Sequence, residues 1–170
     1  MALLARLLRP RRDPRDAVRP LWQAVIAAAR APRWYRELGV EDNLAGRFDM
    51  VTLVLALAML RLEREDDRGE AAARLTELFV ADMDGQLRQS GVGDLVVGKH
   101  VGRLVAVLGG RLGALREAIA GAEPLAAVVE RNVTLREGTA PDPLAAGIRT
   151  LHDRLAALPL ARLLAGEVAP

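Results

Sequence analysis

The sequence predicts an all-α fold, a single compact multi-helix domain around a buried central helix, with a basic N-terminal tail. At 170 residues the chain is long enough for one domain with a sizeable core. Hydrophobic residues make up 51% of the chain but aromatic residues only 3%, because alanine and leucine, both good helix formers, dominate. Runs of β-branched and aromatic residues, which are typical of strands, are missing. We therefore expect helices throughout.

The first half of the chain contains the predicted central helix. Residues 16–30 show apolar residues at helical spacing, and Pro20 is tolerated in the first turn of that helix. Residues 32–38 form a short predicted helix with Trp34 and Tyr35, ended by Gly39. Residues 44–65 form the next helix, and from Phe48 onward it is apolar on almost every side. A helix without a polar face is buried all round, so we expect it at the centre of the core.

Residues 70–89 form an amphipathic predicted helix with a carboxylate inside its apolar stripe. Asp82 lies in that stripe, whereas Asp84 lies on the outer side. A carboxylate that is buried without a partner costs several kcal/mol, so Asp82 must accept hydrogen bonds from a neighbour. The candidates are the N–H groups that open the next helix and the side chains of Arg47, Arg88 or Lys99.

A glycine turn and a ladder of small residues follow. Gly91 and Gly93 suit a tight helix-to-helix turn, and Asp94 is a good N-cap for a helix over residues 95–120. Every fourth position of this helix is small, namely Gly98, Gly102, Ala106, Gly110 and Ala114. A ridge without side chains lets a second helix approach closely. That helix is either the central helix of the same chain or a hydrophobic helix of another protein.

The remaining elements are simpler. Helices are predicted over residues 124–135 and 144–158, with Asp142 as a cap and Pro159 ending the second helix, and a short piece over 160–164. In this division, residues 1–15 are a flexible basic tail and residues 16–165 are the helical domain.

Charge is concentrated at the N-terminus. The net charge is +2, yet residues 1–19 hold six arginines against two aspartates. The body therefore lacks the uniformly basic face of a nucleic-acid-binding domain. The longest apolar run spans eight residues, 53–60, whereas a membrane span needs about 20. We expect a cytoplasmic protein. Its tail is either a frayed basic terminus without a partner or a segment that contacts an anionic surface of the inner membrane or ribosomal RNA.

Each motif that could indicate catalysis, metal binding or cofactor binding lacks a residue that the chemistry requires. Gly93 to Lys99 matches the phosphate-loop pattern, but His100 stands where Ser or Thr must bind magnesium, and a helix precedes it instead of a strand. An EF-hand beginning at Asp82 lacks its bidentate glutamate. The chain has no cysteine, and its two histidines, His100 and His152, lie on different helices. We expect no enzyme, no cofactor, no metal and no small-molecule substrate.

Several short motifs stand out in the first two thirds of the chain: Asp82-Met83-Asp84, Leu87-Arg88, Gly91-Val92-Gly93-Asp94, Gly98-Lys99, Trp34-Tyr35 and Gly46-Arg47-Phe48-Asp49-Met50. Together they resemble the ubiquinol–cytochrome c chaperones, assembly factors of the respiratory cytochrome bc complex. The resemblance covers residues 20–121. One departure is Leu108-Gly109-Gly110-Arg111, where the family pattern has Phe-Tyr-Gly-Arg.

The resemblance implies a non-enzymatic chaperone that binds newly made cytochrome b and supports the biogenesis of ubiquinol–cytochrome c reductase. It also implies contact with the ribosome or with a partner assembly factor. The candidate client-binding or fold-defining residues are Asp82, Asp84, Leu87, Arg88, Gly91, Gly93, Asp94, Gly98, Lys99 and Gly102. The alternative is a helical adaptor that binds the ribosome, nucleic acid or an anionic membrane surface through its basic tail.

Overall fold

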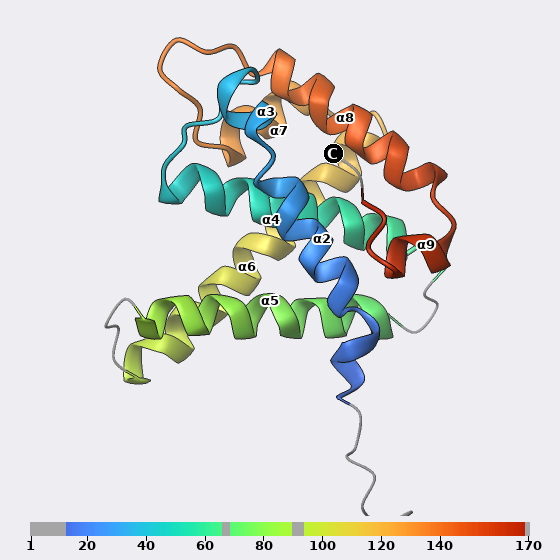
Figure 1. Ribbon diagram of the computed structural model, residues 1–170. Helices are drawn as coiled ribbons and strands as arrows, with labels where there is room; N and C mark the ends of the chain where they lie inside the picture. The colour runs from blue at the N-terminus through green and yellow to red at the C-terminus, as the bar shows by residue number, and fades with distance from the viewer. Residues whose placement is uncertain (1–12, 66–68, 90–93, 169–170) are drawn as a thin grey trace, which may run out of the picture.

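Every regular element of the described residues is helical, as Figure 1 shows. The computed structural model describes residues 13–65, 69–89 and 94–168, with the backbone alone for 87–89 and 94–100. The elements are the 3-10 helix η1 (Pro14–Ala17) and the α-helices α2 (Arg19–Ala29), α3 (Pro32–Arg36), α4 (Leu44–Leu62), α5 (Glu70–Gln89), α6 (Asp94–Ile119), α7 (Leu125–Asn132), α8 (Asp142–Ala157) and α9 (Leu160–Leu164). They pack into one compact domain, which confirms the predicted all-α class.

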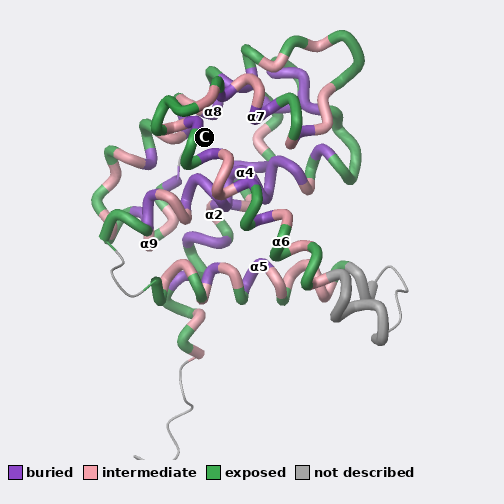
Figure 2. Tube along the Cα trace, turned by 180° about the vertical axis from the view of Figure 1, so that it is seen from behind, coloured by how far each residue is buried: buried purple, intermediate pink, exposed green. Residues whose placement is uncertain are grey.

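Helix α4 is the centre of the core, as predicted. It is buried without interruption from Asp49 to Ala58, visible as the continuous purple stretch in Figure 2. Helix α2 crosses it on one side and α6 on the other (Figure 1). Its start is capped by Asn43, whose side chain accepts a hydrogen bond from the Gly46 N–H at 2.8 Å. Because α2 and α6 pack on different sides of α4, this apolar helix is shielded from water on most of its surface.

The outer helices form two groups around α4. Helices α5 and α6 lie side by side as an antiparallel pair that extends past the end of the core, while α7 and α8 pack on the opposite side (Figure 1). Helix α3 is held against the end of α2 by two hydrogen bonds. The Trp34 indole donates to the Ala28 carbonyl at 2.7 Å, and the Tyr35 hydroxyl donates to the Ala29 carbonyl at 2.8 Å.

Several predicted boundaries were wrong. The first helix is split into η1 and α2, because Pro20 sits at the N-terminal turn of a helix that starts at Arg19. The central helix ends at Leu62 and not at residue 65. Helix α7 stops at Asn132, since the next segment is extended and Leu135 forms an isolated bridge with Val40. Asp142 opens α8, and the cap position before it is occupied by Pro141.

Candidate functional site

A buried ion pair joins α4 to α6. Asp49 and Arg111 are 7% and 8% exposed. The Arg111 Nη2 donates to Asp49 Oδ1 at 2.5 Å, and its Nη1 donates to the Asp49 carbonyl at 3.2 Å and to the Thr52 hydroxyl. The guanidinium also lies 5.7 Å from the centre of the Phe48 ring, within the range of a cation–π contact. The pair therefore fixes the position of α6 on the core helix.

The same carboxylate also holds the segment after α7. Asp49 Oδ2 accepts from the backbone N–H of Thr134 at 2.8 Å and from its hydroxyl at 2.7 Å. A buried charge is tolerated when it is paired and hydrogen-bonded in this way. Arg111 Nε is buried without a hydrogen-bond partner among the described atoms. Asp49 thus ties together three elements that are distant in the sequence.

Sequence reasoning missed this pair. Phe48-Asp49 and Gly110-Arg111 both belong to segments compared with the family pattern, but the two charges were not recognised as partners. A signal was present, because Asp49 and Arg111 are opposite charges on two helices that are otherwise apolar in these stretches. Such charges require each other when both helices are buried.

The outer face of α6 has an unusual composition for a solvent-facing surface. Between Arg103 and Arg116, the exposed positions of this helix carry no charged or polar side chain. These positions are Val105, Ala106, Gly109 and Gly110, and Figure 2 shows exposed stretches along α6 on this side. Val105 is 40% exposed. A surface helix of a globular protein normally turns charged side chains outward. We call the surface formed by Gly102, Val105, Ala106, Gly109, Gly110 and Gly113 the α6 outer face.

No other part of the described structure covers the glycines of this face. A Cβ added at Gly102, Gly109, Gly110 or Gly113 meets nothing within 4 Å. The interpretation that the central helix fills the small-residue ladder is therefore wrong at these positions. Helix α4 packs instead on the opposite side of α6, whose buried stripe is Leu108, Arg111, Leu115 and Ala118. Gly102, Ala106 and Gly110 of the ladder are exposed and lie away from the buried stripe, whereas Ala114 packs partly buried against the core.

The predicted site residues lie on α5, on α6 and in the turn between them. Asp82 and Asp84 are half-buried on α5, and Gly102 is exposed on α6. Asp82 Oδ2 accepts from Gln86 Nε2 at 3.5 Å. Arg47 is not its partner, because Arg47 pairs with Asp42 at 2.7 Å on the surface.

For the other predicted residues, the structure describes either the backbone alone or no atoms. Gly91 and Gly93 lie outside the described residues. The side chains of Leu87, Arg88, Asp94 and Lys99 lie outside them as well, and of Gly98 only the backbone trace is described. Helices α5 and α6 are neighbours, so the two helical parts of the motif approach each other at one end of the molecule (Figure 1). The roles of these residues stay predictions.

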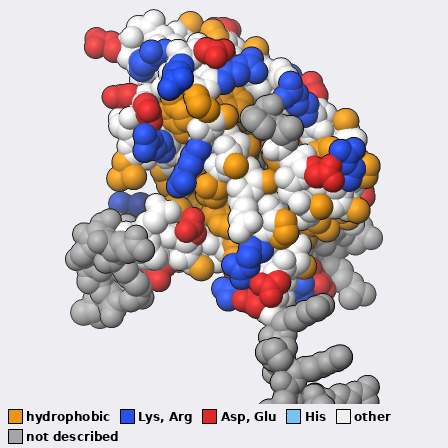
Figure 3. Space-filling view, viewed as in Figure 1, with side chains coloured by type: hydrophobic (Ala, Val, Ile, Leu, Met, Phe, Trp, Pro, Cys, Tyr) orange, Lys and Arg blue, Asp and Glu red, His pale blue; other side chains and the backbone are white. Residues whose placement is uncertain are grey.

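Metal binding and membrane-spanning helices were also considered for the described part of the chain. Among its residues, no three His, Asp or Glu side chains are grouped so that they could hold a metal ion. His152 lies 2.8 Å from Asp153 on α8. None of the described helices combines the length and hydropathy that a membrane span requires. On the face seen in Figure 3, which has the viewpoint of Figure 1, hydrophobic side chains lie among Lys, Arg, Asp and Glu side chains.

The described residues define a class by fold: a small all-α domain, with an exposed uncharged face on α6. The comparisons with known proteins then give the family. The family model described as "Ubiquinol-cytochrome C chaperone" matches residues 36–169, and the chain belongs to this family. The match runs to the C-terminal helices, beyond the 20–121 range in which the sequence motifs were found. The family is one of non-enzymatic assembly factors, as expected from the motifs.

A solved structure agrees with this assignment. The chain is similar to the crystal structure of the Cbp3 homolog from Brucella abortus, with a TM-score of 0.75 and 29% sequence identity. The similarity covers 91% of this chain and 88% of that one. Among curated proteins, no sequence matches this chain.

Proposed function

We propose that this protein binds newly made cytochrome b and holds it during assembly of ubiquinol–cytochrome c reductase. Family membership supports a role in the assembly of the bc complex. The observation that carries the client site is the α6 outer face, an exposed helix surface without a charge between Arg103 and Arg116. Contiguous exposed apolar surfaces typically mark interaction sites, and this face presents Val105 and Ala106 beside two glycines.

The glycines of this face support a role outside the fold. Glycine inside a helix costs up to about 1 kcal/mol relative to alanine. At Gly102, Gly109 and Gly110 the structure has room for a methyl group, so close packing within the chain does not explain them. What they do provide is a surface on which a partner helix can approach the backbone of α6.

A membrane-protein client fits such a surface. Helices of an integral membrane protein are apolar on most faces and must be shielded from water until they are inserted. In the proposed mechanism, one client helix packs along α6 and is released to later subunits. The chaperone would then work at the cytoplasmic side of the inner membrane, where its client is inserted, and no catalytic step is needed.

A pair of matched variants tests this proposal. Ala106→Glu places a charge in the middle of the α6 outer face, and Ala146→Glu places the same charge at an exposed position of α8. The tagged full chain is purified from its native host, and bound cytochrome b is measured by mass spectrometry and haem absorbance. We expect the wild type and Ala146→Glu to recover cytochrome b, and Ala106→Glu to lose at least about tenfold, since a buried unpaired charge costs several kcal/mol.

Two results would count against the proposal. Equal recovery by both variants would move the client site away from α6. Recovery of ribosomal components without cytochrome b, abolished by deletion of residues 1–12, would instead support the adaptor function of the basic tail. The deletion stops at residue 12 because Pro14–Ala17 forms η1, which packs against α5.

A further inference from the structure

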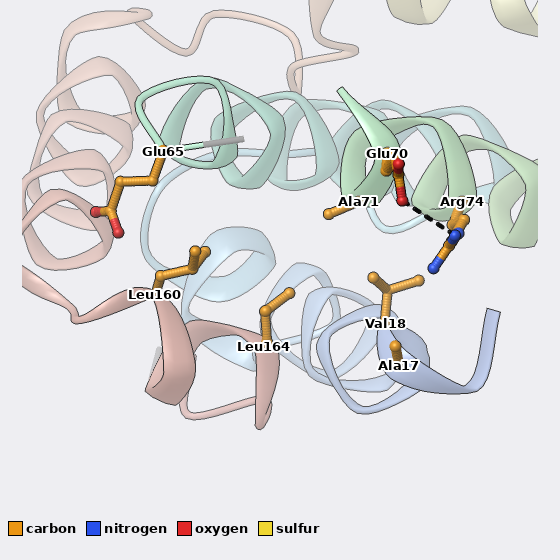
Figure 4. A pocket seen from close by; sticks show the side chains of 8 residues that line it. All are labelled: Ala17, Val18, Glu65, Glu70, Ala71, Arg74, Leu160 and Leu164. Carbon is orange, nitrogen blue, oxygen red and sulfur yellow. Dashed lines mark hydrogen bonds and ion pairs between the residues drawn. The ribbon is translucent and has the colours of Figure 1, made fainter. Parts of the chain in front are cut away.

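A cleft of about 270 Å³ lies where η1 and the start of α2 meet the α4–α5 junction and α9. Its apolar lining comes from three parts of the chain, Ala17 and Val18, Ala71, and Leu160 and Leu164. Figure 4 shows the Val18, Ala71 and Leu164 side chains around one hollow, with the Glu70–Arg74 ion pair at its edge. Glu65 also lines the cleft, but its carboxylate points away from the apolar side chains (Figure 4).

The cleft has room for aliphatic side chains. A cavity of about 150 Å³ lined by aliphatic and aromatic residues holds a benzene-sized group, and this cleft is larger. The first twelve residues, which precede the described part of the chain, contain four leucines: Leu3, Leu4, Leu7 and Leu8. The same residues contain arginines. Two partly exposed carboxylates stand beside the cleft, Glu65 at 49% and Glu70 at 56% side-chain exposure, and they also pair with Arg61 and Arg74.

The described chain begins next to this cleft. Arg74 Nη1 donates to the Pro14 carbonyl at 3.4 Å, so α5 holds the first described turn in place, and Ala17 and Val18 follow within that stretch. Leu8 precedes Asp13 by five residues, a reach of at most about 17 Å for an extended chain. Because Pro10 disfavours a helix at Arg9, the segment can change direction there. A tether this short gives an effective concentration in the millimolar range.

We propose that residues 1–12 dock on their own domain and that Leu7 and Leu8 fill this cleft. The leucines then cover the apolar lining, while the arginines between and beside them lie near the two glutamates. The inference is independent of the client, because the cleft and the α6 outer face are formed by different residues. It assigns to the basic tail a partner within the chain.

Disulfide trapping tests the docking directly, since the chain contains no native cysteine. The full-length variant Leu7→Cys/Ala71→Cys places one thiol in the tail and one in the cleft wall. The control Leu7→Cys/Ala146→Cys places the second thiol at an exposed position near the start of α8, away from the cleft. A disulfide needs Cα atoms within about 7 Å, so under mild oxidation we expect at least about tenfold faster intrachain cross-linking in the cleft pair.

Hydrogen exchange gives a second test without added thiols. Replacement of both leucines in Leu7→Ser/Leu8→Ser should speed amide exchange of α9 about fivefold or more, because that helix loses its cover. Equal cross-linking in the two cysteine pairs, or unchanged exchange in α9, would overturn the proposal. Binding of the tail to phosphatidylglycerol vesicles with no preference for the cleft thiol would overturn it too, and would assign the leucines to a lipid surface.

Discussion

Removal of Arg111 should destabilise the domain far more than removal of a comparable surface arginine. In Arg111→Met the Asp49 carboxylate keeps its two hydrogen bonds from Thr134 but loses its counter-charge. Breaking a buried pair from one side costs about 3–5 kcal/mol, because the remaining charge cannot return to water.

The structure supplies its own control for this magnitude. The Asp42–Arg47 pair has a similar separation, 2.7 Å against 2.5 Å for Asp49–Arg111. Its side chains are 58% and 60% exposed, whereas each side chain of the buried pair, taken without its backbone, is 10% exposed. Exposed pairs contribute little because water solvates the separated charges almost as well. Arg47→Met should therefore leave the unfolding midpoint close to that of the wild type.

Urea and thermal unfolding, followed by circular dichroism and by the fluorescence of buried Trp22 and Trp34, measure both effects. For a domain of this size each kcal/mol corresponds to about 2–4 °C in Tm, so Arg111→Met should melt roughly 6–20 °C lower. The double variant Asp49→Asn/Arg111→Met removes the orphaned charge and should recover at least about 1 kcal/mol of that loss. Equal losses for Arg111→Met and Arg47→Met, or no recovery in the double variant, would refute the reasoning.

Three further predictions concern other positions. Gly46→Ala should lower the free energy of unfolding by more than about 1 kcal/mol in urea titrations, because its Cβ would overlap the Glu41 carbonyl oxygen. Gly109→Ala should raise it by about 0.5–1 kcal/mol in the same assay, since the new methyl group meets nothing within 4 Å. Hydrogen bonds from the Arg15 side chain, and then from its backbone N–H, lower the pKa of Asp13 to about 2. Because this pKa is depressed on folding, the contribution of the cap is present above pH 3.8 and lost as the pH falls through about 2. An NMR titration of the carboxyl group should show that midpoint, and Arg15→Ala should move it back towards 3.8.

The order of helices was predictable because each helix has a local signal. Apolar residues at helical spacing located the helices, and the absence of a polar face in α4 identified it as the central one. The boundaries were less predictable. Nothing local ends α7 at Asn132, for example, because the extended segment that follows is held by distant groups, Asp49 and the backbone of Glu41.

The candidate site was predictable only where the spacing of residues along one helix indicates it. The small-residue ladder and Gly102 were recognisable from spacing, but which side of α6 faces the core depends on how α4 and α6 pack. The Asp49–Arg111 pair was missed for the same reason, since its members are 62 residues apart. For Asp82 the sequence suggested partners on other segments, whereas its described hydrogen bond is with Gln86 on its own helix.

The glycines of α4 and α6 differ in whether the fold has room for a side chain at their positions. Gly46 is required by the fold, because any side chain there would collide with the backbone of Glu41. Gly109 and Gly110 are not, because the structure leaves open space where their side chains would be, and alanine would make α6 a better helix. The fold itself therefore does not explain these two glycines. The buried Arg111 fixes the inner side of the same helix, so the partner proposed for its outer side would contact α6 away from this ion pair.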